Sequence, residues 1–102
     1  MKIIIGAVVM VAVTLSMSQL VMAGDAEAGK AKSQACVSCH GMNGKSTNPN
    51  NPNLAGQKKA YLVKAMKAYK DGKRQDPMMS SLMAGLSDAD MENLAEFYSK
   101  VK

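Results

Sequence analysis

Apolar and polar residues follow a helical period in two stretches of the chain. In residues 58–71 apolar side chains recur every three or four positions and the other face is basic, which predicts an amphipathic helix ending near Gly72. Residues 87–101 show the same period, and Ser87 with Asp90 three positions later is typical of a helix N-terminus. Residues 25–38 are rich in helix formers and contain no proline, which predicts a further short helix.

Two other stretches lack any period. Residues 41–56 are dominated by Asn, Gly, Ser and Pro, and we expect a long surface loop that wraps around something. Residues 73–85 are predicted to form a second irregular segment. Nothing after residue 24 alternates with the period of two that marks a half-buried strand. The sequence therefore predicts an all-α domain with three main helices and two loops.

The first 23 residues have a different character. Met1 and Lys2 are followed by a run without charge from Ile3 to Gly24, which ends in the small residues Val21 and Ala23. This layout is typical of a secretory signal peptide. We expect cleavage after Ala23, a mature domain at 24–102, and a periplasmic location without membrane insertion. A retained membrane anchor is the alternative, because the uncharged run is long enough to span a bilayer.

Composition limits what the remaining domain can be. The whole chain has 102 residues, enough for one domain at most, and only 4% of them are aromatic, with no Trp. A small domain with few large side chains often needs a metal, a disulfide or a cofactor to complete its fold. Two cysteines and one histidine exclude a scaffold of several disulfides and are too few for a four-ligand zinc site without a carboxylate or a second chain.

The main chemical motif is Cys36-Val37-Ser38-Cys39-His40. A C-x-x-C-H run is the attachment pattern for haem c, because two thiols about one helical turn apart can both reach one edge of the porphyrin. The histidine that follows can then bind the iron as its proximal ligand. Three alternatives are a thioredoxin-type redox pair, which lacks its strand-to-helix context here, a simple disulfide, and zinc.

The sixth iron ligand cannot be a second histidine of this chain, because His40 is the only one. Met66 and Met91 lie on the apolar faces of predicted helices and are expected to fill the core. Met42 follows His40 too closely to reach the opposite face of the ring. This leaves Met78, Met79 and Met83 as candidates, together with a lysine or an open or water-bound position.

Several segments in order resemble a known family. They are Cys36-Val-Ser-Cys-His40, Pro52-Asn-Leu-Ala-Gly-Gln57, Tyr61-Leu-Val-Lys, Asp76-Pro-Met-Met79, Leu86-Ser-Asp-Ala-Asp90 and Leu94-Ala-Glu-Phe-Tyr98. From Gly24 to Lys102 the chain resembles a class I monohaem cytochrome c of the c553/c554 type, which is also similar to each half of dihaem cytochrome c4. The resemblance implies the small class I fold, with helices and loops around one covalent haem c.

The same resemblance implies particular roles for individual residues. The axial methionine of such proteins lies seven residues before the leucine of the Leu-Ser-Asp motif, which corresponds to Met79 here. Pro52 matches the proline whose carbonyl accepts the Nδ1 proton of the haem-binding histidine. Gly29 and the face formed by Leu94, Phe97 and Tyr98 match the crossing of the terminal helices, where a glycine lets an aromatic ring approach.

Ligation by histidine and methionine would leave no vacant position for a substrate and would raise the reduction potential. We therefore expect a periplasmic one-electron carrier that is not an enzyme and needs no catalytic residue. One alternative is the haem subunit of a periplasmic complex such as a flavocytochrome sulfide dehydrogenase. Another is a ligand-binding sensor or peroxidase with an open sixth position.

Charge is distributed unevenly along a chain with a formal net charge of +5. The middle of the chain is basic, with Lys58, Lys59, Lys64, Lys67, Lys70, Lys73 and Arg74, whereas Asp88, Asp90, Glu92 and Glu96 gather in the last helix. This asymmetry favours redox partners with acidic docking surfaces, although a solvated helix face would look the same. We expect a monomer, and no binding of nucleic acid because no aromatic residues interleave with the basic ones.

Overall fold

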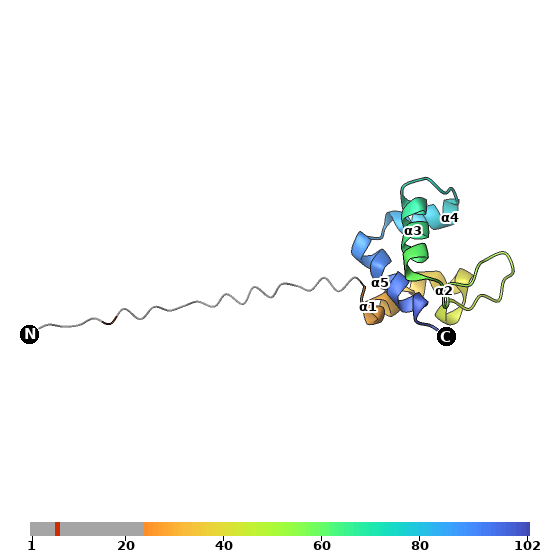
Figure 1. Cartoon of the computed structure of the whole chain (residues 1–102). Helices are drawn as coiled ribbons and strands as arrows, with labels where there is room; N and C mark the ends of the chain where they lie inside the picture. Colours follow the sequence, from red (N-terminus) through yellow and green to blue (C-terminus); the bar gives the residue numbers. More distant parts are fainter. Residues whose placement is uncertain (1–5, 7–23) are drawn as a thin grey trace, which may run out of the picture.

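The computed structural model describes Gly6 and residues 24–102 of the chain. The predicted signal peptide therefore lies outside the described residues, apart from Gly6. The elements in order are α1 (Ala26–Lys32), α2 (Gln34–His40), the 3-10 turn η1 (Met42–Gly44), α3 (Lys59–Lys70), α4 (Pro77–Ala84) and α5 (Asp88–Ser99). Across these described residues there is no strand, which confirms the all-α prediction (Figure 1). None of these helices is long and apolar enough to cross a membrane.

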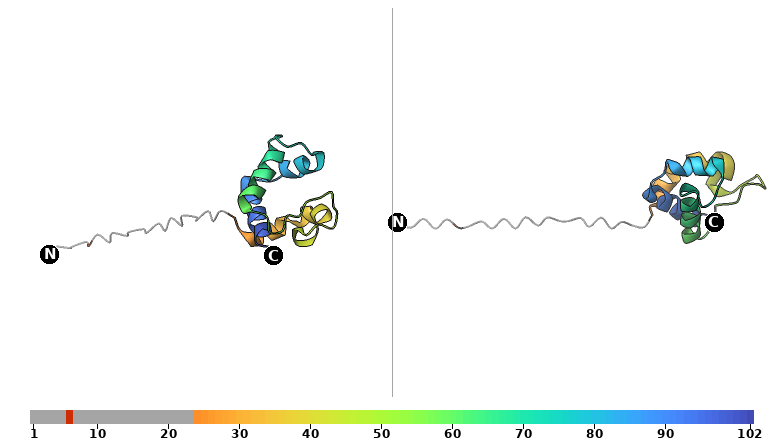
Figure 2. Two further views of the ribbon diagram at one scale, coloured as in Figure 1. Left: turned by 45° about the vertical axis from the view of Figure 1, so that its right-hand side comes forward. Right: turned by 90° about the horizontal axis from the view of Figure 1, so that it is seen from above.

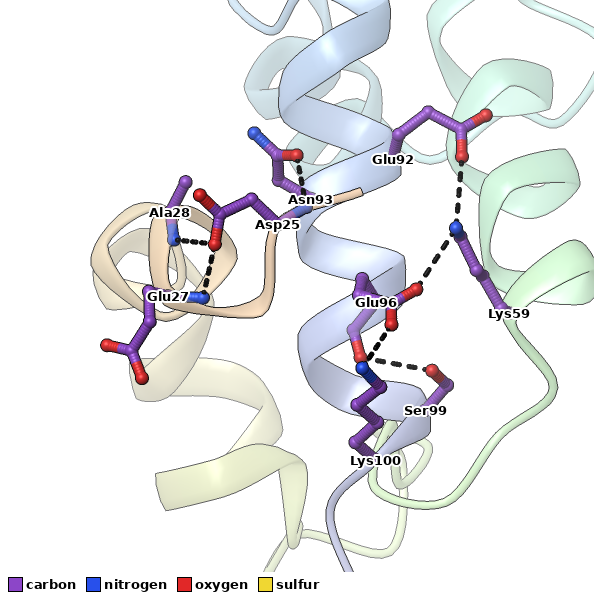
Figure 3. A network of polar contacts seen from close by, with 9 residues as sticks. All are labelled: Asp25, Glu27, Ala28, Lys59, Glu92, Asn93, Glu96, Ser99 and Lys100. Atoms are coloured by element: carbon purple, nitrogen blue, oxygen red, sulfur yellow. Dashed lines mark hydrogen bonds and ion pairs between the residues drawn. The ribbon is translucent and has the colours of Figure 1, made fainter. Parts of the chain in front are cut away.

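The stretch at residues 25–38 forms two helices, so the prediction of one helix there was wrong. Asp25 begins α1, and its side chain accepts hydrogen bonds from the backbone N–H groups of Glu27 and Ala28 (Figure 3). Ser33 ends α1, with its hydroxyl donating to the carbonyl of Lys30 at 2.6 Å. A serine hydroxyl that binds the preceding turn competes with the regular helix. The chain then starts again as α2, which continues to His40.

The N-terminal and C-terminal helices cross at Gly29, as the resemblance implied. A Cβ atom at Gly29 would lie 1.9 Å from the carbonyl oxygen of Asn93, so the two backbones touch. The backbone N–H of Asp25 also donates to the side chain of Asn93 at 2.8 Å (Figure 3). The atoms nearest to Gly29 belong to the backbone of Asn93 and Leu94, whereas the resemblance implied an aromatic ring there.

Gly29→Ala is expected to destabilise the folded protein by about 1–3 kcal/mol, because the added methyl group would force the two backbones apart. The measurement is denaturant unfolding of the haem-containing protein. Gly85→Ala is the matched control, since a Cβ there would meet its nearest atom at an ordinary 3.7 Å. Equal stability of the two variants would contradict the close crossing.

The apolar core is small. Leu62 of α3 packs with Leu94, Ala95 and Tyr98 of α5, and Met66 packs against this cluster. Met91 is fully buried, so the expectation that Met66 and Met91 are packing residues is confirmed. Only six apolar side chains in the described part of the chain are buried, counting Met83 and Met91. A core of this size fits a domain that is completed by a further group.

Three acidic residues of α5 are paired with lysines, which come from α1, from α3 and from the C-terminal end of α5 itself. Lys59 of α3 lies 3.0 Å from Glu96 and 3.8 Å from Glu92, and Lys100 lies 2.5 Å from Glu96 (Figure 3). Lys100 and Lys59 together lower the pKa of the Glu96 carboxyl. Asp90 pairs with Lys32 of α1 at 3.6 Å. These pairs neutralise much of the acidic face, so the charge asymmetry is weaker than the sequence suggests.

The second predicted loop contains a helix, α4, which corrects the expectation of an irregular segment at 73–85. Asp76 caps this helix, accepting hydrogen bonds from the N–H groups of Met78 and Met79, each at 3.0 Å. Pro77 occupies the first turn, where its missing N–H costs nothing. Figures 1 and 2 show α4 at the C-terminal end of α3, and α2 with the loop that follows it at the other end.

Candidate functional site

The helix α2 carries Cys36, Cys39 and His40. The two cysteines lie three positions apart on this helix, so their side chains leave it about one turn apart, as the motif requires. Both are free thiols and partly exposed. The Ser38 hydroxyl lies 3.9 Å from the sulfur of Cys39. The helix therefore presents two thiols and an imidazole from a single short segment.

A tight turn follows His40. Gly41 has a positive φ of 82°, and a Cβ there would lie 2.0 Å from the carbonyl oxygen of Lys45. Only glycine meets both conditions at low cost. Beyond the turn, the carbonyl of Gly44 accepts hydrogen bonds from the N–H groups of Leu54 at 2.8 Å and Ala55 at 3.1 Å. These bonds close the loop between Gly44 and Leu54 and fold it back toward α2.

The closed loop holds the imidazole of His40. The Pro52 carbonyl oxygen lies 2.9 Å from Nδ1 of His40, and the His40 side chain is buried. Because a carbonyl can only accept, Nδ1 carries a proton in this contact, and in the neutral ring Nε2 is then the nitrogen with the lone pair. The Asn51 side chain donates to the carbonyl of Cys39 at 2.8 Å. Sequence reasoning missed Asn51, since one asparagine in a loop of many gives no distinguishing signal.

The candidate methionine ligands differ in exposure. Met78 is 63% exposed and Met83 only 2%, whereas Met79 is half-buried. Met42, the first residue of η1, is 69% exposed. On α4, therefore, Met78 lies in solvent, Met83 lies in the core, and one methionine lies at the boundary between the two. Met79 is the candidate at this boundary, on α4 and thus on a different element from His40.

The electrostatic state of Cys36 argues against a thioredoxin-type pair. Burial raises the pKa of the Cys36 thiol, and the nearby Tyr98 hydroxyl offsets this rise only in part. A reactive redox cysteine needs a lowered pKa, because the thiolate is the nucleophile. Cys36 is therefore a neutral thiol near pH 7.

The donor set of the site fits haem c. Within residues 24–102 and Gly6, no group of three or more His, Cys, Asp or Glu side chains could hold a metal ion by itself. The helix α2 instead offers one imidazole Nε2 and two thiols on one helical turn, while the candidate thioethers lie on α4, at the opposite end of α3 (Figure 2). The hydrogen bond from Nδ1 to a carbonyl is the kind of contact that orients a metal-binding histidine and raises its basicity.

Comparison with known proteins gives concordant matches. Residues 26–102 match the family model described as cytochrome c. The chain is 48% identical to cytochrome c4 of Pseudomonas aeruginosa over 80 residues, which cover 78% of this chain and 40% of that protein. It is 45% identical to cytochrome c-554(548) of Halomonas halodenitrificans, covering 76% of this chain and 96% of the relative.

A solved structure matches as well. Reduced recombinant cytochrome c4 of Pseudomonas stutzeri superposes with a TM-score of 0.75 at 40% identity, covering 78% of this chain and 47% of that one. The chain thus spans less than half the length of the cytochrome c4 proteins that it matches, and nearly all of the cytochrome c-554(548) length.

Proposed function

Because the chain belongs to the cytochrome c family, we propose that it is a periplasmic carrier of single electrons. The cofactor of the family is covalently bound haem c. The observation that carries the proposal is the buried His40 imidazole, whose Nδ1 is held by the Pro52 carbonyl at 2.9 Å next to two free thiols. This arrangement leaves Nε2 ready to bind a metal ion.

Three residues of α2 and two of the loop after it have proposed roles. Cys36 and Cys39 form the two thioether bonds to the haem, and His40 binds the iron through Nε2. Asn51 and Pro52 hold the end of α2 and the imidazole ring by their hydrogen bonds. These contacts fix the ring before an electron arrives, so little of the protein has to move during transfer.

Met79 is the proposed sixth ligand, and its half-buried position on α4 supports this role. The bound iron supplies a reversible one-electron couple. A thioether favours the reduced state, so Met79 would raise the reduction potential relative to a second nitrogen ligand. Met79 would also fill the last coordination position, which excludes added ligands and therefore disfavours a sensor or a peroxidase.

Residues 1–23 are proposed to act as the export signal, with cleavage after Ala23. The uncharged run from Ile3 to Gly24 behind Lys2 supports this proposal. Two neighbouring thiols tend to form a disulfide in an oxidising compartment, and the proposed attachment of haem would use both Cys36 and Cys39 instead. The domain at 24–102 would then work in the periplasm as a monomer.

The proposed partners are redox proteins with acidic surfaces. A groove of about 660 Å³ runs along α3, with Lys64, Lys67 and Lys73 beside the apolar residues Ala60 and Val63. Within the described residues these three lysines have no ion pair, whereas Lys59 pairs with Glu92 and Glu96. The cations are therefore available to attract a negatively charged partner.

Stopped-flow electron exchange tests both the carrier function and the partner. The reduced protein is expected to pass one electron to ferricyanide, and the oxidised protein is expected to accept one electron from an acidic, low-potential donor such as reduced flavodoxin. With the acidic protein the rate should fall about tenfold as ionic strength rises from 0.01 to 0.15 M, because salt screens the attraction. Lys67→Glu should remove most of this salt dependence, whereas Lys30→Glu on α1 makes the same charge change away from the groove.

The outcomes separate the two parts of the proposal. Absence of electron exchange even with ferricyanide would overturn the carrier function. If electrons are exchanged at a rate that does not depend on salt, or if Lys67→Glu and Lys30→Glu have equal effects, docking at the α3 groove is overturned. The carrier function then still stands. Purification as a tight complex with a larger flavoprotein would favour the haem-subunit alternative over a free carrier.

A further inference from the structure

The hydroxyl group of Tyr98 is a buried polar group without a satisfactory partner. Tyr98 lies on α5 and is only 3% exposed. In the described part of the chain, its hydroxyl oxygen makes no well-formed hydrogen bond. Buried tyrosine hydroxyls nearly always find a partner, so an unsatisfied one needs an explanation.

Packing holds the aromatic ring of Tyr98 in place. A Cβ atom at Gly44 would lie 2.7 Å from one ring carbon and 2.9 Å from the next, so the ring packs directly on the backbone of η1. The other side of Tyr98 belongs to the core cluster with Leu62 and Leu94. The position of the hydroxyl is therefore set by packing on both sides.

Two polar side chains lie near this hydroxyl, those of Cys36 and Ser33. The Ser33 hydroxyl donates to the Lys30 carbonyl at 2.6 Å, and its oxygen, which could still accept, makes no hydrogen bond with Tyr98. Cys36 packs against the same cluster as Tyr98, and burial raises the pKa values of both groups. Both groups are therefore neutral near pH 7. Once the Cys36 sulfur is part of a thioether it carries no proton, so the Tyr98 O–H can only donate and the sulfur can only accept.

We propose that Tyr98 is a positioning residue whose hydroxyl donates a hydrogen bond to the Cys36 sulfur once that sulfur is bonded to haem. The inference rests on the proposed attachment at Cys36. The bond would fix the Cys36 side chain in one orientation and draw electron density from the attached edge of the cofactor. It would thereby favour the reduced state.

The test compares Tyr98→Phe with wild type, both carrying haem. Loss of the hydrogen bond is expected to lower the thermal midpoint by roughly 4–8 °C and to lower the reduction potential. The thioether C–S stretch in the resonance Raman spectrum should shift in deuterated water for wild type but not for the variant. Tyr61→Phe is the matched control, because Tyr61 is 52% exposed and loses the same atom.

Wild-type spectra keep the inference testable even if Tyr98→Phe does not fold. A C–S stretch of wild type that is insensitive to deuterium would overturn the hydrogen bond. A Tyr98→Phe protein as stable as wild type with the same potential would also overturn it, since removing an unsatisfied hydroxyl costs nothing. Intact-protein mass shows separately whether haem is attached, so failure of the proposed function would be recognised first.

Discussion

Replacing Cys36 and Cys39 together by serine is expected to yield an exported chain without covalent haem and without a stable fold. The described core has only six buried apolar side chains. A ligand present at a thousand times its dissociation constant adds about 4 kcal/mol to the free energy of unfolding, which is about 5–15 kcal/mol for a typical domain. Covalent attachment raises the effective concentration of the haem much further. The measurements are the mass of the denatured protein and its far-ultraviolet circular dichroism.

Ser38→Ala is the control for this double variant. Ser38 lies between the two cysteines, is exposed, and has only a distant contact to the Cys39 sulfur. The Ser38→Ala protein should keep its covalent haem and its helices. Retention of covalent haem by the double variant would refute attachment at α2, and a fully helical chain without haem would show that the core is sufficient alone.

Met79→Ala is expected to open the sixth position of the iron. The reduction potential should fall by roughly 0.2 V, a quarter of the range of about 0.8 V that axial ligands span. The ferric protein should change from low spin to high spin, and the ferrous protein should bind carbon monoxide rapidly. Redox titration and rapid-mixing spectroscopy measure these changes.

Met78→Ala provides the comparison at the neighbouring position. Met78 is 63% exposed, and its N–H bond to Asp76 does not depend on its side chain. This variant should resemble wild type in potential, spin state and carbon monoxide binding. If the two variants exchange these properties, Met78 is the ligand, and if neither differs from wild type, neither methionine binds the iron.

Local signals in the sequence were sufficient for part of the fold. Ser87 and Asp90 predicted the start of α5, and the structure contains the full reciprocal cap, with Asp90 Oδ2 accepting from Ser87 N–H at 3.0 Å. This backbone bond is the main reason that the pKa of Asp90 is lowered. The period of residues 58–71 likewise predicted α3 to within a residue at each end.

Other elements were missed because their signals are short or lie far apart in the sequence. Asp76 followed by Pro77 is a cap and a first-turn residue, and this pair predicts α4 when read together. The helix break at Ser33 depends on one hydroxyl, which a pattern of helix formers conceals. The contact between Tyr98 and Gly44 joins distant segments, so no local pattern could indicate it.

Some residues of the candidate site could likewise be found from local sequence signals, whereas others could not. The spacing of Cys36, Cys39 and His40 is a local signal, and the family resemblance pointed to Pro52 before the loop geometry was known. The bond from Asn51 to the Cys39 carbonyl depends on how the loop closes between Gly44 and Leu54. Loop closure of this kind follows from tertiary contacts, which is why sequence reasoning did not find it.

The most direct test of the central claim is the visible absorption spectrum of the exported wild-type protein in both oxidation states. With Cys36 and Cys39 attached to haem, and His40 and Met79 bound to its iron, the spectrum should report one c-type haem per chain. The ferric form should show the weak long-wavelength band of an iron–methionine bond, and the ferrous form should not bind carbon monoxide at neutral pH. A high-spin ferric protein without that band, which binds carbon monoxide readily when reduced, would contradict the account.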